Sequence, residues 1–316
     1  MLMRTTLLLA LLLATTTLSA QTADTLPKNW KLKAIYGING SQTSFVNWNA
    51  GGRSNVALLG FVDATGNYAK GTFKWDNDAH LALGAVNYIG KINDGSKRFQ
   101  KTDDRIEFNT NAGYRLKKHY YMSFLGNFRT QMLDGFAYPN DSIAVSRFMA
   151  PGYATLALGI DYTPNDNFNL FVSPLAAKMT FVRDQRLADN GAFGVDAATL
   201  DGLGNVITAG KQFRGEFGAY VQMKWKKNLA KNIDFKSALQ LFSNYLHNPQ
   251  NMDVNAETLF SFKVNSWLST SLQWNLIYDD DIKITDRDGN VGPRTQFKSI
   301  FGLGMAFSIQ NYKEKK

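Results

Sequence analysis

The sequence predicts an all-β fold, a transmembrane antiparallel up-and-down β-barrel of about twelve strands, and three observations support this class. An export leader begins the chain, segments of alternating apolar and polar residues recur to its end, and their connections alternate strictly between short and long. Bacterial outer-membrane barrels have short periplasmic turns, longer extracellular loops and an even number of strands. Both termini are therefore expected on the periplasmic side.

A targeting segment begins the chain. Arg4 is its only charged residue, an apolar run follows at residues 7–13, and Leu18-Ser19-Ala20 resembles a cleavage site. The run is too short for a spanning helix, which needs about 20 apolar residues. We expect a cleaved signal peptide at residues 1–20, a short periplasmic segment at 21–29, the barrel at 30–309 and a polar tail at 310–316.

Strands of the N-terminal half are predicted near residues 30–39, 55–68, 73–88, 105–116, 120–131, 153–162 and 168–181. Successive side chains of a strand point to opposite faces, so alternation identifies an apolar and a polar face. The first strand places apolar residues from Trp30 to Ile38 on one face. The third, fourth and fifth set aromatic and aliphatic residues against polar faces that carry Lys74, Asp76, Asp78, His80, Arg105, Glu107, Arg115 and Arg129.

Strands of the C-terminal half are predicted near residues 213–225, 233–245, 254–264, 268–278 and 297–309. The first of these has the clearest pattern in the chain. Phe213, Phe217, Val221 and Trp225 share one face, and the opposite face carries Arg214, Glu216, Gln222 and Lys224. The last strand alternates apolar residues from Phe297 to Ile309, so its ending differs from the terminal aromatic common in such barrels.

The connections give independent support. Short turns are predicted at residues 70–71, 117–119, 163–167, 226–232 and 265–266, and long loops at 41–54, 89–103, 133–151, 184–210, 246–253 and 280–294. The loop at 184–210 contains a turn-forming cluster at residues 202–205, which predicts a hairpin between residues 199–200 and 206–207.

Two stretches carry a family likeness. They are Asn47-Trp48-Asn49-Ala50-Gly51-Gly52, and Tyr68-Ala69-Lys70-Gly71 followed by Phe73-Lys74-Trp75-Asp76-Asn77. Together they resemble an uncharacterised Bacteroidota family of exported proteins, domain of unknown function 3078. The resemblance implies an outer-membrane barrel with no assigned activity and no catalytic or ligand residues to carry over.

Composition limits the functional classes. The chain has no cysteine, which excludes disulfides, zinc–thiolate sites and a cysteine nucleophile. Loss of the leader removes only Arg4 from a formal net charge of +9, so the mature chain stays basic. Because the chain is exported, we do not expect its positive charge to bind nucleic acid. Aromatic residues make up 13% of the chain, which fits the rings of Trp and Tyr at the two membrane interfaces of a barrel. We expect a monomer in contact with outer-membrane lipid and lipopolysaccharide, without a cofactor.

The predicted inward faces mix both signs of charge. The lumen candidates are Lys74, Asp76, Asp78, His80, Arg105, Glu107, Arg115, Arg129, Arg214 and Glu216, with Lys236, Lys298, Asp161, Asp234 and Glu257 on further strands. Such a lumen is either cross-linked by ion pairs and nearly closed, or a narrow and mildly anion-preferring channel. Twelve strands are fewer than the 16–18 of aqueous porins, so side chains fill more of the lumen.

Other clusters have an ordinary and a chemical interpretation. Asp76, Asp78 and His80 could bind a metal or form a base with its orienting group, but a ladder of ion pairs with Arg105 and Arg115 is favoured. The acidic stretches at residues 279–281 and 286–290 could bind calcium, although a solvated turn is favoured. In the loop at Asn47, Trp48, Gly51 and Gly52, the tryptophan could narrow the lumen, dock a glycan or join the outer girdle.

Three functional hypotheses follow. The first is a small passive channel or solute-transport barrel, with selectivity set by charged lumen residues. The second is a structural or accessory barrel whose long loops bind a protein, a lipid or a polysaccharide. The third is a lipid hydrolase built on His80, His119 or His247, with Ser243 as the best local nucleophile. The hydrolase is disfavoured, and the protein is predicted not to be an enzyme.

Overall fold

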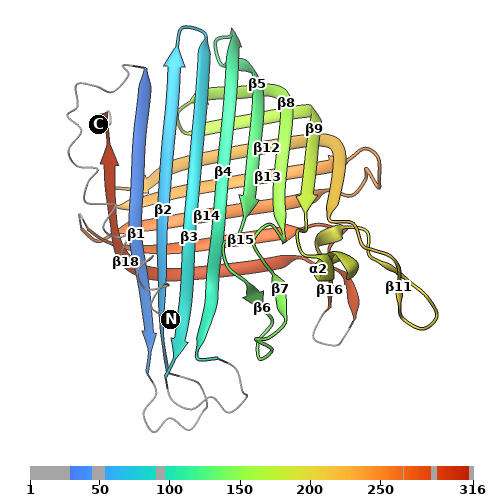
Figure 1. The fold of residues 1–316 in the computed structure, drawn as a ribbon. Coiled ribbons are helices and arrows are strands. Elements are labelled where there is room, and N and C mark those ends of the chain that lie inside the picture. Colours follow the sequence, from blue (N-terminus) through green and yellow to red (C-terminus); the bar gives the residue numbers. More distant parts are fainter. Residues whose placement is uncertain (1–28, 45–53, 90–96, 266, 286–289, 313–316) are drawn as a thin grey trace.

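Twelve antiparallel strands close into a barrel in the computed structural model, which describes residues 29–44, 54–89, 97–265, 267–285 and 290–312 (Figure 1). Each barrel strand pairs with the next barrel strand along the chain, and the last returns to the first. The strands are β1 (Trp30–Thr43), β2 (Asn55–Lys70), β3 (Phe73–Tyr88), β4 (Phe99–Lys117), β5 (Tyr120–Thr130), β8 (Gly152–Asn165), β9 (Phe168–Phe181), β12 (Phe213–Ala230), β13 (Ile233–Asn244), β14 (Asp253–Lys263), β15 (Leu268–Tyr278) and β18 (Gln296–Gln310). The predicted fold class is confirmed.

The barrel has two rims that differ in their connections. The short-turn rim carries connections 71–72, 118–119, 166–167, 231–232 and 264–267, and the long-loop rim carries 44–54, 89–98, 131–151, 182–212, 245–252 and 279–295. The predicted alternation of short and long connections is therefore confirmed. Because Lys33 of β1 pairs with Gln310 of β18, the barrel begins and ends at the short-turn rim. The predicted leader and the loop residues Asn47, Trp48, Gly51 and Gly52 lie outside the described residues.

Strand boundaries deviate from prediction where the strands become polar. Strand β4 begins six residues before the predicted start at Arg105, and β12 continues to Ala230, so the turn predicted at 226–232 shrinks to 231–232. Lys226 and Lys227 pair with Lys236 and Phe235 of β13 in a regular ladder. Backbone hydrogen bonds do not depend on apolar side chains, so a strand can extend beyond its alternating segment.

The long loops form small structures of their own. The predicted hairpin at residues 199–207 is confirmed as β10 (Thr199–Leu200) and β11 (Val206–Thr208). Two other hairpins were not predicted, β6 (Gly135–Phe136) with β7 (Ala144–Ser146) and β16 (Lys283–Thr285) with β17 (Val291–Pro293). A short helix α2 (Gln185–Asp189) is capped by the Asp184 carboxylate, which accepts a hydrogen bond from Leu187 N, and a 3-10 turn η2 (Ala192–Gly194) follows.

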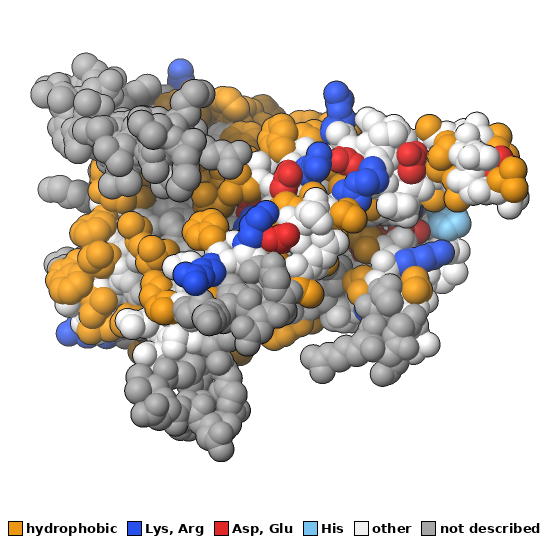
Figure 2. Space-filling model, turned by 60° about the horizontal axis from the view of Figure 1, so that its bottom comes forward, with side chains coloured by type: hydrophobic (Ala, Val, Ile, Leu, Met, Phe, Trp, Pro, Cys, Tyr) orange, Lys and Arg blue, Asp and Glu red, His pale blue; other side chains and the backbone are white. Residues whose placement is uncertain are grey.

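Apolar side chains cover the outside of the barrel. Figure 2 shows hydrophobic side chains over much of the visible wall. Residues on the predicted apolar faces are exposed, among them Leu81, Leu83, Phe108, Phe124, Leu158, Val172, Phe217 and Phe301. Toward the short-turn rim, aromatic rings touch in clusters, such as Trp30 with Tyr68 and Trp75, and Trp225 with Phe235. No described helix has the length and apolar character needed to cross a membrane.

A second apolar cluster lies inside the barrel, where the sequence predicts mainly polar residues. It consists of Leu125, Ala157, Phe171, Ala176, Tyr220 and Phe242, all buried. These residues come from β5, β8, β9, β12 and β13, which are neighbours in the closed sheet. They fill part of the lumen, so less of its volume is left for polar side chains and water.

Gly218 lies at a register shift in β12, against the backbone of β13. A Cβ atom there would lie 1.9 Å from the Ser243 carbonyl oxygen. Overpacking of this kind costs about 1–3 kcal/mol, so Gly218→Ala should lower the free energy of unfolding of the refolded barrel by about that much. Urea titration in detergent, followed by tryptophan fluorescence, measures the loss. Gly60→Ala is the matched control, because among the described residues no heavy atom beyond its two chain neighbours lies within 4 Å of its added Cβ. Equal stability of the two variants would contradict the prediction.

Candidate functional site

Ion pairs cross the lumen from wall to wall. Arg105 of β4 bonds Glu257 of β14 at 2.9 Å, and these strands are on opposite sides of the closed order. Lys224 of β12 bonds Asp78 of β3 at 3.1 Å. Lys298 of β18 bonds Asp103 of β4 at 3.0 Å. The lumen is narrow, because two side chains from different walls are long enough to meet across it.

The pair of Arg105 with Glu257, called here the cross-lumen pair, belongs to a hydrogen-bonded network. The Arg105 guanidinium also bonds Glu107 on its own strand. Glu107 accepts hydrogen bonds from Asn109 at 3.1 Å and Asn127 at 3.3 Å. A partly buried charge pair is stable only when its remaining donors and acceptors are satisfied, and this network meets that condition.

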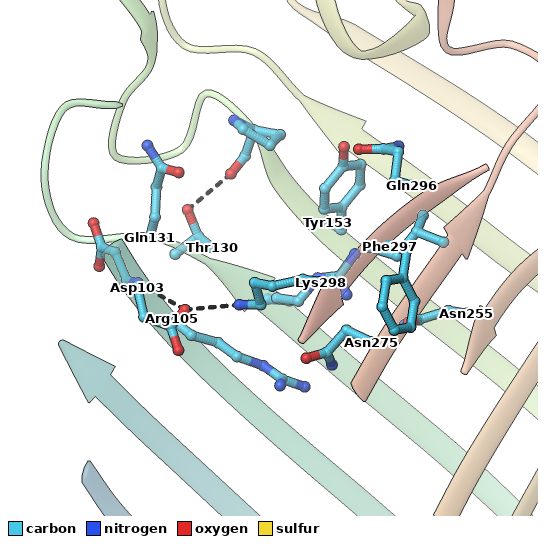
Figure 3. A pocket seen from close by; sticks show the side chains of 14 residues that line it. Asp103, Arg105, Thr130, Gln131, Tyr153, Asn255, Asn275, Gln296, Phe297 and Lys298 are labelled. Atoms are coloured by element: carbon cyan, nitrogen blue, oxygen red, sulfur yellow. Dashed lines mark hydrogen bonds and ion pairs between the residues drawn. The ribbon is translucent and has the colours of Figure 1, made fainter. Parts of the chain in front are cut away.

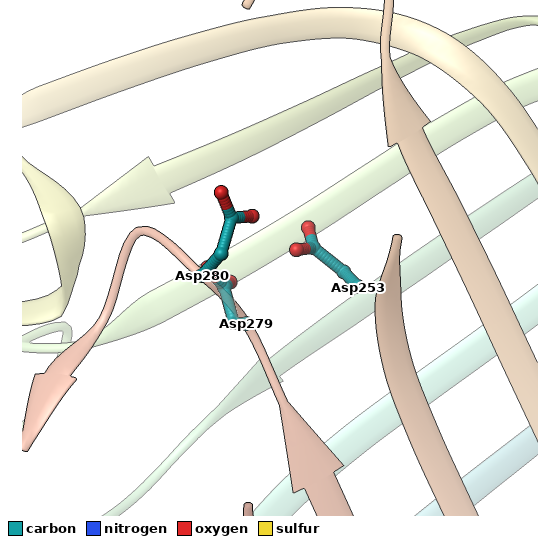
Figure 4. A group of neighbouring side chains, drawn as sticks. All are labelled: Asp253, Asp279 and Asp280. Atoms are coloured by element: carbon teal, nitrogen blue, oxygen red, sulfur yellow. The ribbon is translucent and has the colours of Figure 1, made fainter. Parts of the chain in front are cut away.

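Lys178 holds a second cluster near the long-loop rim. Its ammonium lies 2.5 Å from Asp253, 2.9 Å from Asp279 and 3.7 Å from Glu216. Asp253, Asp279 and Asp280 lie together where β14 begins and β15 ends (Figure 4). Their oxygens are within 4.8 Å of one another, a spacing that could hold a metal ion. The Lys178 ammonium already pairs with two of these three carboxylates, Asp253 and Asp279.

Other donors engage the rest of the predicted acidic stretch. Asp280 accepts a hydrogen bond from Asn251 at 2.7 Å. Asp281 accepts one from Arg214, whose guanidinium also bonds Glu216 and the Gly194 carbonyl. Residues 286–289 lie outside the described residues. Residues 280–281 form a turn, but Asp279 is buried and paired with Lys178, so the interpretation of residues 279–281 as a solvated turn is correct only in part.

Lys74 organises the lumen closer to the short-turn rim. Its ammonium bonds Asp161 at 2.8 Å, and Asp161 is fully buried. Thr163, Asn111 and Asn169 also donate to the Asp161 carboxylate. The Lys74 ammonium lies 4.3 Å from the centre of the Tyr121 ring as well. One basic side chain therefore joins β3 to β5 and β8.

Asp76, Asp78 and His80 lie on one face of β3, but their partners differ from the expected ladder with Arg105 and Arg115. Asp76 is 3.8 Å from Lys74, Asp78 bonds Lys224 across the lumen, and His80 Nδ1 lies 2.5 Å from Asp63. Strand register explains the difference. Arg105 lies opposite Ala82, four residues beyond Asp78, and Arg115 lies beside Tyr121 near the rim.

The remaining histidine candidates do not assemble with a serine on their own strand. His119 packs edge-on against Tyr162 in a short turn. The Ser243 hydroxyl, the best local nucleophile near His247, donates instead to the Pro249 carbonyl at 2.7 Å. These contacts give no support to the histidine-dependent hydrolase.

Two polar cavities flank the cross-lumen pair. The larger, about 370 Å³, lies toward the long-loop rim (Figure 3) and is lined by Asp103, Asp104, Arg105, Arg129, Thr130, Gln131, Pro151, Tyr153, Asn255, Asn275, Ile277, Gln296, Phe297 and Lys298. The smaller, about 110 Å³, is lined by Arg105, Glu107, Asn109, Lys224, Ala238, Gln240, Asn255 and Glu257. Arg105 and Asn255 line both cavities, so the two adjoin at this point.

Sequence reasoning placed Arg105, Glu107, Arg129, Glu257 and Lys298 in the lumen but missed Asp103, Asp104 and most of the uncharged lining residues. Tyr153, Asn255 and Asn275 were not singled out. The alternation and pairing of the strands indicate the inward position of the two asparagines, because Asn255 and Asn275 share a face with Glu257 and Lys298. Amide side chains on an inward face are as informative as charges, since they mark positions that hydrogen-bond solutes.

Exposed basic residues surround the short-turn rim. They are Lys31, Lys70, Arg115, Lys117, Lys118, Lys226, Lys227, Lys231, Lys236 and Lys263, named here the basic rim. Among the described residues of this rim, Asp166 is the one exposed acid. The long-loop rim, in contrast, mixes both signs of charge. The barrel therefore has one strongly electropositive end.

Part of the chain matches a family model. Residues 41–136 match the family described as "Protein of unknown function (DUF3078)", which covers less than half of the chain. The match includes the two stretches from which the resemblance was predicted and confirms it over these residues. No curated protein sequence matches the chain.

Solved bacterial barrels resemble the structure at low identity. The COG4313 outer membrane channel from Pseudomonas putida F1 has 10% identity and a TM-score of 0.39, with 90% of this chain and 96% of that chain covered. The translocator domain of autotransporter NalP from Neisseria meningitidis has 9% identity and a TM-score of 0.35, with 90% of each chain covered. The P. putida toluene transporter TodX has 11% identity and a TM-score of 0.30, with 92% of each chain covered. These likenesses carry no conclusion about a solute or a partner.

Lys178→Met should destabilise the folded barrel strongly, because it leaves three carboxylates without their shared cation. Breaking a buried ion pair from one side costs about 3–5 kcal/mol. Adding Asp279→Asn should restore part of that loss by removing one of the like charges. Urea titration of the refolded variants measures both effects. Lys263→Met is the control, because Lys263 is 56% exposed and pairs at the rim with Asp234, where loss costs about 1 kcal/mol or less. A Lys178→Met loss no larger than that of Lys263→Met would refute the assigned role.

Proposed function

We propose that this protein is an outer-membrane barrel that forms a narrow channel for small solutes, with a preference for anions. One observation carries the proposal: inside a closed barrel, two adjoining polar cavities flank the cross-lumen pair. Two further ion pairs, Lys224 with Asp78 and Lys298 with Asp103, also cross the lumen beside these cavities. Charged residues that line a narrow lumen set the selectivity of a channel.

The membrane location rests on the outer surface and on the leader. A closed ladder leaves no unpaired strand edge, so such a barrel can span a bilayer. Apolar residues cover its wall, and aromatic clusters lie toward the short-turn rim, as in the interfacial girdles of membrane barrels. Residues 1–20 support export. With this orientation, the short-turn rim and both ends of the barrel face the periplasm.

The cross-lumen pair is the proposed constriction. Arg105 bonds Glu107 on its own strand as well as Glu257 on the far wall. It can therefore release Glu257 without losing every carboxylate partner. The Glu257 side chain is 30% exposed, so this contact is only partly buried.

The basic rim provides the proposed anion preference. Lys226 and Lys236 are directly opposite in the ladder between β12 and β13, on the same face as Lys224, which reaches across the lumen. Like charges at a pore mouth raise the local concentration of oppositely charged solutes. Anions are therefore concentrated at the short-turn mouth before they reach the constriction.

A second candidate function has its own observation. Hairpin β10–β11 exposes Leu200, Leu203, Val206 and Ile207, with Leu203 89% exposed. Exposed apolar clusters often mark protein contacts. A partner captured reproducibly from native membranes, and lost when residues 199–208 are replaced by a short Gly-Ser turn, would support an accessory barrel. Absence of any such partner would count against it.

Single-channel recording in a planar bilayer tests the channel directly. The refolded mature chain should give small, discrete conductance steps. Glu257→Gln should raise the open fraction or the step size at least twofold, because it removes the charge that holds Arg105 across the lumen. Asp196→Asn is the matched control, since Asp196 is an exposed loop acid paired with Lys211. A folded barrel that never conducts, with or without Glu257→Gln, would refute the channel.

Reversal potentials in a salt gradient test selectivity. Lys226→Glu combined with Lys236→Glu should shift the reversal potential toward cation preference, because two mouth-facing charges change sign. Lys211→Glu is the control, as Lys211 is exposed in a long loop at the other end of the barrel, where it pairs with Asp196. An unchanged reversal potential in the double variant would show that the basic rim does not set selectivity.

A further inference from the structure

Arg129 differs from six other basic residues of the lumen. Lys74, Arg105, Lys178, Arg214, Lys224 and Lys298 each bond a carboxylate. The Arg129 guanidinium instead lies over the Tyr153 ring, 5.2 Å from its centre, and has no hydrogen bond or ion pair within the described residues. It lines the larger cavity. Five N–H donors are thus available there without a protein acceptor.

The nearest candidate acceptor is already occupied. Glu107 lies opposite Arg129 in the ladder between β4 and β5. Its Oε2 accepts from Arg105, and its Oε1 accepts from Asn109 and Asn127. Both oxygens are therefore used, and the Arg129 guanidinium is turned to Tyr153 instead. A guanidinium stacked on a tyrosine ring keeps its edge free for a planar anion.

Further polar groups around the cavity have unused hydrogen-bonding capacity. Asn255 donates its Nδ2 to Gln240 and so leaves Oδ1 unused, and Asn275 accepts from Gln273 through Oδ1 and so leaves Nδ2 unused. Neither the Tyr153 hydroxyl nor the Gln296 amide forms a hydrogen bond within the described residues. In Figure 3 these four side chains and Lys298 surround one space, with Phe297 at its side.

The charges around the cavity balance only when Arg129 is counted with them. Lys298 bonds Asp103 at 3.0 Å, and Lys101 bonds Asp104 at 2.9 Å. Arg105 bonds both Glu107 and Glu257. One of these two carboxylate charges is left over, and Arg129, opposite Glu107 in the ladder, offsets it without bonding it. Among the described residues that line the cavity, Arg129 is the one cation with no carboxylate on its N–H donors, so these donors are open to an anionic group.

We propose that this cavity binds a small hydroxylated carboxylate of the sugar-acid class, with the carboxylate on the Arg129 guanidinium. Two parallel N–H donors of arginine match the two oxygens of a carboxylate. The amides of Asn255, Asn275 and Gln296 can bond hydroxyl groups of the ligand. A volume of about 370 Å³ lies at the small end of the range for ligand sites. The inference gives the proposed channel its solute class and in that respect rests on the proposed function, but binding is measurable without transport.

Equilibrium binding to the refolded mature chain tests the site. Isothermal titration in detergent with D-glucuronate should show saturable binding, whereas glucose, which lacks the carboxylate, and glucosamine, which carries a positive charge, should not bind detectably. Arg129→Gln should weaken glucuronate binding at least tenfold, and Arg129→Lys should retain part of it. Heat-modifiable migration on gels confirms that each variant is folded.

Arg147→Gln is the matched control, because Arg147 lies in a long loop, 3.3 Å from Asp184, outside the cavity. It should bind glucuronate as the unmodified chain does. No saturable binding by the folded chain, or equal binding by Arg129→Gln, would overturn the proposal. Conductance recorded on the same preparation separates the two proposals: binding without conductance refutes the channel alone, and conductance without binding refutes the sugar-acid site alone.

Discussion

Closure of the backbone hydrogen-bond ladder between β1 and β18 leaves the barrel without an open strand edge. Every barrel residue then has one of two environments, because successive side chains of a strand face opposite sides. The outward set is apolar and exposed. The inward set must fit within a cylinder of twelve strands, and its charges must find partners in that confined space. The ion pairs across the lumen follow from this constraint.

The inward set divides the lumen into two unequal sides. Phe171, Tyr220 and Phe242 fill the side of β9, β12 and β13 with apolar contacts. The cavities lie between this side and the strands β4, β14, β15 and β18. Arg129 of β5 and Tyr153 of β8 reach the larger cavity, and Lys224 of β12 and Gln240 of β13 reach the smaller one. Lys178 and its carboxylates also bridge β9 and β14 near the long-loop rim, so side chains fill this part of the lumen. A small lumen with one arginine that bonds no carboxylate favours recognition of a specific class of small anion over general permeability.

Much of the fold was accessible from the sequence, because alternation and loop length are local properties. The segments at 73–88, 168–181 and 268–278 coincide with β3, β9 and β15. Partners across the lumen were not accessible. Asp78 bonds Lys224, 146 positions away, and this depends on the register of strands that the sequence does not specify. The same holds for Arg129. Its inward position was predicted, but the absence of a carboxylate partner was not. The Glu107 carboxylate opposite it is occupied by Arg105, Asn109 and Asn127.

The internal apolar cluster also has a mechanical consequence. Leu125, Ala157, Phe171, Ala176, Tyr220 and Phe242 tie five neighbouring strands together from the inside, in addition to their backbone ladder. The strands from β14 through β18 and β1 to β4 are joined across the lumen mainly by ion pairs, which can exchange partners without loss of packing. The barrel is therefore stiff along one wall and compliant along the other. If the lumen widens, the wall joined by ion pairs is therefore the one that can rearrange without breaking packed contacts.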